Sequence, residues 1–320
     1  MPVVAEVLRS GFVEAVHCGA VLARDGAGET VVAVGDVAGP VFPRSCNKPL
    51  QAAAMVRAGL DISDRQLALV AASHSGTPVH VELARVILHS AQLDESALVN
   101  TPGLPLDETA MRDLLASGGG PDSIHQNCSG KHAGMVATCI QNGWPVPSYC
   151  EPTHPLQRLI ADTIEELAGE NVSHVGVDGC GAPLFALSLN GLSRAFAVLS
   201  TSAVGTPEHR VANAMRKHPD AVGGPQRAVT RLMSGIPGLV AKDGAEGAFA
   251  AALPDGATAV VKIADGAGRA AVPVVVSALR ALGVEAAVLD ELATAPVLGG
   301  GHPVGEVRAI RGLCEREHIN

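Results

Sequence analysis

A serine and a lysine three residues apart, Ser45 and Lys48, form the most promising chemical pair in the sequence. They follow Pro43 and open a stretch, residues 49–60, whose apolar spacing predicts a helix. Side chains at positions i and i+3 share a helix face, so the hydroxyl and the amine are expected to meet. A neutral amine can take the serine proton and make the hydroxyl a nucleophile. Burial and a helix N-terminus both favour the neutral amine.

The distribution of lysine supports this interpretation. The chain has only five lysines against eighteen arginines, and four of the five lie in short polar runs: Lys48, Lys131, Lys242 and Lys262. A chain that uses arginine for ordinary surface charge is expected to keep lysine where a titratable amine matters. Chance is the alternative for any single lysine, but the four together favour function.

The motif that contains Lys242 indicates a fold. Lys242-Asp243-Gly244 resembles the Lys-Thr-Gly element of penicillin-recognising serine enzymes, in which a Ser-x-x-Lys helix follows the first strands and the lysine strand comes late. This chain has the same order. The alternative is that Lys-Asp-Gly forms a simple turn.

Two cysteines and a lysine raise the possibility of a metal site. Cys128, Lys131 and Cys180 could supply two thiolates and a nitrogen to Zn²⁺, with His132 as a more usual nitrogen donor. Spacing alone favours the alternative that both cysteines are ordinary buried thiols.

Ser73, His74 and Ser75 form a third polar run, with His80 shortly after it. They could act as hydroxyl donors beside a histidine base, although an isolated histidine more often has a structural role. No Gly-x-Ser-x-Gly elbow is present, so a Ser-His-Asp triad is not predicted.

The surrounding pattern predicts one α/β (α+β) domain over residues 1–320. Strands are expected at both ends of the chain and helices in the middle. The two ends would join into one antiparallel sheet, with a helical lobe inserted between them. The expected sheet lobe is residues 1–60 plus 221–320, and the expected helical lobe is residues 61–220. The expected strands are 3–8, 12–24, 29–36, 247–253 and 257–265, and a last helix is expected over 271–283.

Composition limits the partners. The net charge of −9 argues against nucleic acid or an anionic membrane as the main partner. No apolar run is long enough to span a bilayer, and the first twenty residues lack the basic start of a signal peptide. With seven cysteines and no export signal, we expect a cytoplasmic protein without disulfides.

Six motifs in order resemble the asparaginase II family of the rhizobial, thermolabile type, over residues 5 to 275. They are Glu14-Ala-Val-His17-x-Gly19, Pro43-Arg44-Ser45-x-x-Lys48-Pro49-x-Gln51, Ser73-His74-Ser75-Gly76, Asn127-Cys128-Ser129-Gly130-Lys131-His132, Asp178-Gly179-Cys180-Gly181 and Lys242-Asp243-Gly244-Ala245-Glu246-Gly247. The resemblance implies the serine β-lactamase/glutaminase-like fold and a homodimer. Cys46, where a plainer residue is usual, is a departure from the family pattern.

The resemblance also implies roles for individual residues. Ser45 and Lys48 would form one Ser-Lys pair, and Ser73 a second with Lys242, with Lys262 as the weaker candidate. Zinc would be held by Cys128, Lys131 and Cys180. The residues expected to orient substrate or support the site are Arg44, His132, Asp178, Ser75 and Lys262.

The expected activity is hydrolysis of L-asparagine to L-aspartate and ammonia through a serine acyl-enzyme, with zinc near the substrate. The alternatives are attack by zinc-bound water, glutaminase-like activity, and a catalytically silent binding protein. The sequence leaves open which serine makes the first attack.

Overall fold

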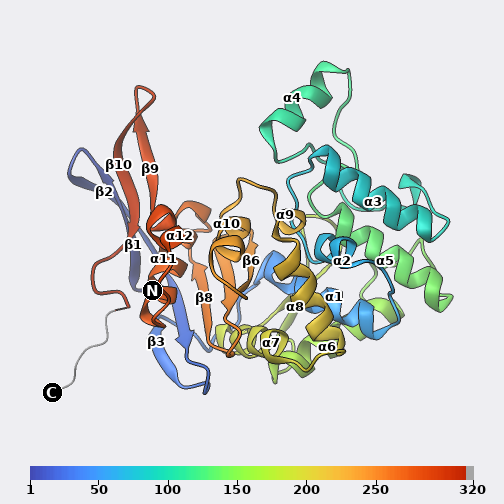
Figure 1. The fold of residues 1–320 in the computed structure, drawn as a ribbon, viewed down its shortest axis with the longest axis horizontal. Coiled ribbons are helices and arrows are strands. Elements are labelled where there is room, and N and C mark those ends of the chain that lie inside the picture. Colours follow the sequence, from blue (N-terminus) through green and yellow to red (C-terminus); the bar gives the residue numbers. More distant parts are fainter. Residues whose placement is uncertain (315–320) are drawn as a thin grey trace.

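The computed structural model describes residues 1–314, which form a mixed α/β fold as expected from the sequence (Figure 1). The strands are β1 Val3–Arg9, β2 Phe12–Arg24, β3 Thr30–Val34, β4 His174–Val177, β5 Pro183–Ala186, β6 Val240–Gly244, β7 Ala248–Ala252, β8 Thr258–Ile263, β9 Thr294–Gly299 and β10 His302–Ala309. The helices are α1 Lys48–Arg57, α2 Asp64–Val70, α3 Pro78–Ser90, α4 Glu108–Ala116, α5 Ser129–Asn142, α6 Pro155–Ala168, α7 Leu189–Thr201, α8 Pro207–Lys217, α9 Pro219–Val222, α10 Ala228–Gly235, α11 Gly268–Ala281 and α12 Ala287–Leu292, with 3₁₀ turns η1 Arg44–Asn47 and η2 Glu95–Ala97.

The two ends of the chain form one antiparallel sheet, as the sequence predicts. Its strand order is β6-β7-β8-β2-β1-β10-β9, and β3 pairs with the far end of β2. The junction between the N-terminal and later strands is the β2–β8 pair, in which Val21 lies opposite Val261. Helices α1 to α10 lie between β3 and β6 in the chain, as an inserted helical part.

Strands β9 and β10 are a feature that the sequence patterns did not predict. They carry Pro296, Pro303 and Gly305, residues that weaken a strand pattern. Gly305 is required by close packing, since a Cβ there would lie 1.9 Å from the Leu8 carbonyl oxygen of the neighbouring strand. A register shift between Pro303 and Gly305 accommodates the irregularity.

Strands β7 and β8 are buried on both faces. Alternate side chains of a strand point to opposite faces, and here each face meets a helix. Ala250 and Val260 pack in one apolar cluster with Phe196 of α7. Phe249 and Val261 pack in the larger core with Val275 of α11. Strand β6 pairs with β7 at the edge of this covered region and contacts η1.

The helical part packs around α1, whose residues Lys48 to Val56 are all buried. Helices α5, α6 and α8 surround it, and α4 lies at the periphery with no buried residue of its own (Figure 1). The short hairpin β4–β5 belongs to this part and was also not predicted. Within residues 1–314, no helix is long and apolar enough to cross a membrane.

Candidate active site

The Ser45 turn begins with a strained residue. Arg44 has a φ of 52°, in the left-handed region, which costs a non-glycine residue about 1–3 kcal/mol. Its side chain is held by an ion pair from Nε to Asp178 Oδ1 at 2.9 Å. The chain then turns through η1 into α1, so that Ser45 remains partly exposed while Lys48 is buried. Such backbone strain is typical of functional sites.

The Lys48 amine makes three hydrogen bonds, and they differ from the expected pairing. They run to the Ala72 carbonyl at 2.6 Å, Ser73 Oγ at 3.0 Å and Cys128 Sγ at 3.1 Å. Within residues 1–314, no hydrogen bond joins the Lys48 amine to the Ser45 hydroxyl; the two residues are joined only through the backbone, by the Lys48 N–H and the Ser45 carbonyl. The i, i+3 spacing therefore brings Ser45 and Lys48 onto one short segment, but the amine points past Ser45 to the segment after α2.

Lys242 also has a different partner from the one expected. Its amine contacts Asp243, at 2.6 Å to the carbonyl and 2.5 Å to Oδ1, rather than Ser73. Asp243 in turn pairs with Arg227. Burial lowers the pKa of Lys242. Although burial opposes it, the charges of Lys242 and Arg227 lower the pKa of Asp243.

Ser45 and Ser73 nevertheless line one cavity of about 220 Å³. Its other lining residues are Leu106, Asn127, Arg227, Asp243, Gly244 and Ala245. The end of β6 closes it by packing tightly on the Ser45 turn, because a Cβ on Gly244 would lie 2.6 Å from the Pro43 carbonyl oxygen. Lys242-Asp243-Gly244 thus forms a strand edge beside the serine, and not a free turn.

The cysteine cluster lies directly behind Lys48. Cys128 immediately precedes α5, Lys131 lies in the first turn of that helix, and Cys180 lies in the turn between β4 and β5. The Lys131 amine is 3.2 Å from Cys180 Sγ, and the two thiols pack in one small buried cluster. Lys48 touches both Ser73 and Cys128, so the cluster and the cavity share one wall.

The electrostatics of the cluster are those of one thiolate beside a cation. A hydrogen bond from Cys128 and the charge of Lys131 lower the pKa of Cys180 to about 5. The same hydrogen bond, together with burial, raises the pKa of Cys128 to about 12. Burial opposes the charge on Lys131, but Cys180, Cys128 and Asp178 raise its pKa overall.

The donor set fits a zinc ion in type and proximity. Two thiol sulfurs and one amine nitrogen converge at a buried point, and three protein ligands are usual for zinc sites that keep a position open. Lys131 would have to lose its proton on binding, as metal ligands do. Over residues 1–314, no group of three or more His, Cys, Asp and Glu side chains could hold a metal by themselves. Lys131 is therefore essential to any such site.

The remaining predicted residues surround these two features. His132 is buried, its Nδ1 is 2.7 Å from Tyr149 Oη, and its Nε2 has no partner among the described residues. Burial lowers the pKa of His132 well below its usual value, so the ring is neutral. Ser75 donates to the Gly223 carbonyl at 2.5 Å. Lys262 donates to the carbonyls of Glu246 and Ile263, away from Ser73.

Six cavity residues carried no predicted role: Asn127, Asp243, Gly244 and Ala245, which belong to the quoted motifs, and Leu106 and Arg227, which do not. Asn127 directly precedes Cys128 in a quoted motif, so the sequence offered a reason to predict it as a site residue. Arg227 and Leu106 stand alone in the sequence, so only the folded chain places them at the serines.

A family comparison agrees with the motifs. The family described as L-asparaginase II matches residues 5–309. The chain belongs to the L-asparaginase II family. Membership makes it a hydrolytic enzyme, while the rhizobial, thermolabile subtype stays a prediction. Among curated proteins, none matches this sequence.

Two solved structures are similar in part. One is a β-lactamase from Mycobacterium bovis, with 16% identity, a TM-score of 0.43, and 78% of this chain and 87% of the other covered. The second is EstCE1, a hydrolase with promiscuous acyltransferase activity, with 13% identity, a TM-score of 0.37, and 83% and 90% covered. At these scores neither likeness bears on the function of this chain.

Proposed function

We propose that this protein hydrolyses L-asparagine to L-aspartate and ammonia through a serine acyl-enzyme. The observation that carries the proposal is the hydrogen bond from buried Lys48 to Ser73 Oγ, at the wall of the cavity that Ser45 also lines. A serine hydroxyl linked to an amine at a cavity is the minimum machinery for acyl transfer. Membership of the L-asparaginase II family supports L-asparagine as the substrate, with its side-chain amide as the bond that is hydrolysed.

We assign the attack to Ser45. Its Oγ has no hydrogen-bond partner within residues 1–314 and it is partly exposed at the cavity, whereas Ser73 is buried and bonded to Lys48. The Ser45 oxygen would form a bond to the side-chain amide carbon, and its proton would pass to neutral Lys48, with Ser73 as the intermediate hydroxyl. Collapse of the tetrahedral adduct would break the C–N bond, and the same proton would leave with ammonia. Water would then release aspartate by the reverse route.

Backbone and charged groups supply the remaining functions. Ser45 and Ala245 both line the cavity where β6 meets η1, and we assign the oxyanion to their backbone N–H groups. Arg227 and Asp243 line the same cavity with opposite charges. They are suited to the α-carboxylate and α-ammonium groups of an amino acid, respectively.

We further propose that Cys128, Lys131 and Cys180 hold zinc. A zinc ion there would share the binding of the α-amino or carboxylate group with Asp243 or Arg227 and help to orient the amino acid. The expected result is about one zinc per chain by elemental analysis, lost in Cys180→Ser. Cys314→Ser, at the far side of the sheet, is the matched control and should keep its zinc. Equal zinc content in the two variants would contradict the site.

The enzymatic test is ammonia release from L-asparagine and L-glutamine. Ser45→Ala should lower turnover of L-asparagine by roughly 1,000-fold or more, because the proposed nucleophile is removed. Ser202→Ala, on the exposed end of α7, should be unaffected. Near-normal turnover by Ser45→Ala would reject Ser45 as the nucleophile and favour attack by Ser73 or by metal-bound water. Preference for glutamine would change the proposed substrate but not the mechanism.

We also propose a cytoplasmic homodimer. All seven cysteines are free thiols, which suits a reducing compartment. Exposed apolar residues on the β1–β2 hairpin give a second copy a surface to cover, as discussed below.

A further inference from the structure

A second cavity, of about 440 Å³, lies on the other side of the Arg44–Ser45 turn. One wall is apolar and includes Phe42, Val177 and Leu184. The other wall carries Arg44, Glu246 and Lys262. The proposed reaction does not use this cavity, although Arg44 and the turn after β6 separate it from the catalytic one.

The charged wall has unused hydrogen-bonding capacity. Arg44 uses Nε on Asp178, and its Nη1 is 3.7 Å from Glu246 Oε1, which is longer than a hydrogen bond. Within residues 1–314, the terminal nitrogens of Arg44 and the carboxylate oxygens of Glu246 form no hydrogen bond. Lys262 donates two N–H groups to backbone carbonyls, which leaves the third. A carboxylate and an ammonium group could therefore both be satisfied here.

Two of these charged residues have an unfavourable backbone conformation. Among the described residues, four non-glycine residues have positive φ, and two of them, Arg44 at 52° and Glu246 at 56°, line this cavity. Each costs about 1–3 kcal/mol, and such strain concentrates at ligand clamps. The two strained residues hold opposite charges at one rim.

We infer that this cavity binds a zwitterionic α-amino acid with an apolar side chain. The carboxylate would accept hydrogen bonds from the terminal guanidinium nitrogens of Arg44 and from the free N–H of Lys262, since a planar guanidinium suits a carboxylate. The ammonium group would pair with Glu246, whose side chain is 60% exposed at the mouth. Phe42, Leu184 and Val177 would cover the side chain. The catalytic cavity has no comparable apolar wall, so the two sites select different amino acids.

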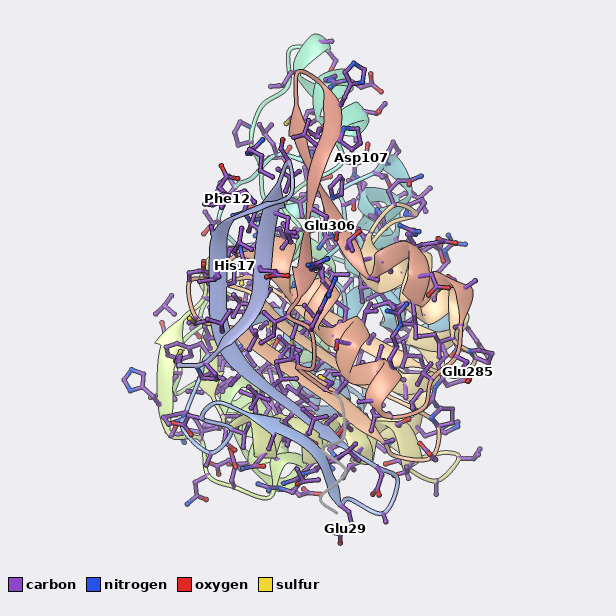
Figure 2. All side chains as sticks on the ribbon, turned by 90° about the vertical axis from the view of Figure 1, so that its left-hand side faces the viewer. Phe12, His17, Glu29, Asp107, Glu285 and Glu306 are labelled. Atoms are coloured by element: carbon purple, nitrogen blue, oxygen red, sulfur yellow. The ribbon has the colours of Figure 1, made fainter. Side chains whose placement is uncertain are left out.

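The test is calorimetric titration of the full-length protein with L-leucine and two analogues. 4-Methylpentanoate lacks the ammonium group, and 3-methylbutylamine lacks the carboxylate. L-Leucine should bind at one site per chain, and the affinity of each analogue should be at least about tenfold lower than that of L-leucine. Glu246→Gln should lower the affinity for L-leucine by about tenfold and leave the affinity for 4-methylpentanoate unchanged. Glu285→Gln, exposed and remote, is the control and should change neither (Figure 2).

Two results would overturn the inference. One is the absence of saturable binding of L-leucine to the unaltered protein. The other is displacement of L-leucine by excess L-aspartate, which would place leucine in the catalytic cavity. The titration measures heat and not turnover, so its outcome is independent of whether the protein hydrolyses asparagine.

Discussion

Lys48 is the residue at which the proposed chemistry converges, because its amine touches both Ser73 Oγ and Cys128 Sγ. A single buried amine is thus shared by the serine pair and the cysteine cluster. Lys242 is fixed separately by Asp243, which Arg227 also holds. The site therefore contains one lysine in contact with a hydroxyl and a second lysine in contact with a carboxylate, and not two equivalent Ser-Lys pairs.

The Asp243 ion pairs predict a pH dependence of stability. The folded-state pKa of Asp243 lies below its ordinary value, because Lys242 and Arg227 outweigh the effect of burial. The resulting stabilisation is present above the unfolded pKa of about 4 and is lost as the pH falls through the folded pKa. Asp243→Asn should be less stable than the unaltered protein at pH 7, and the difference should shrink toward pH 3.

Urea unfolding across this pH range measures that difference. The control is Asp113→Asn, on the exposed face of α4, for which the difference should stay small and constant. A difference for Asp243→Asn that is equal at pH 7 and pH 3 would show that its ion pairs do not stabilise the fold.

At the scale of elements, the position of β6 against η1 decides whether the cavity forms. Gly244 has no room for a side chain, since a Cβ would meet the Pro43 carbonyl oxygen at 2.6 Å. That atom is backbone, two residues before the proposed nucleophile, so it can move only with the Ser45 turn.

Gly244→Ala should therefore lower kcat for L-asparagine by at least about tenfold and destabilise the fold by about 1–3 kcal/mol, the usual cost of overpacking. Gly120→Ala is the matched control, since its added Cβ would meet nothing within 4 Å. Ammonia release and urea unfolding would be measured for both. Equal kcat for the two variants would mean that β6 does not position Ser45.

The elements that local patterns predicted are those with strong periodicity. The helix after Ser45 and the strands of residues 12–24 and 257–265 have long, mostly apolar patterns, and the structure confirms them as α1, β2 and β8. Strand β10 was missed because Gly305 and Pro303 interrupt its pattern, and only the packing against Leu8 explains that glycine. The Lys48–Ser73 contact joins α1 to the segment after α2, so it depends on tertiary packing and not on spacing. Arg227 had no local signal for the same reason.

At the scale of the whole molecule, the sheet projects beyond the helices that cover it. Figure 2 shows the β1–β2 hairpin, with Phe12 near its tip, beside the β9–β10 hairpin. Phe12 is 74% exposed, and Val13, Val16 and Leu298 are exposed as well. Exposed apolar side chains on a projecting hairpin are typical of interfaces, and the proposed homodimer gives those around Phe12 a partner.

Phe12→Glu should shift the protein from dimer toward monomer in sedimentation, from twice 32.4 kDa to 32.4 kDa, because a charge would be buried in the interface. Val204→Glu is the control, since Val204 is 87% exposed in a loop far from this surface. A monomer in the unaltered protein, or an equal shift in both variants, would reject this interface.

An acyl-enzyme on Ser45 can be detected by mass spectrometry of the protein after a rapid acid quench with L-asparagine. We expect a species heavier by one aspartyl group, with the added mass on the peptide that contains Ser45. This species should be absent from Ser45→Ala. An aspartyl group mapped to Ser73 would contradict the assignment of the nucleophile. Turnover of L-asparagine with no covalent species, undiminished in Ser45→Ala, would contradict the acyl-enzyme itself.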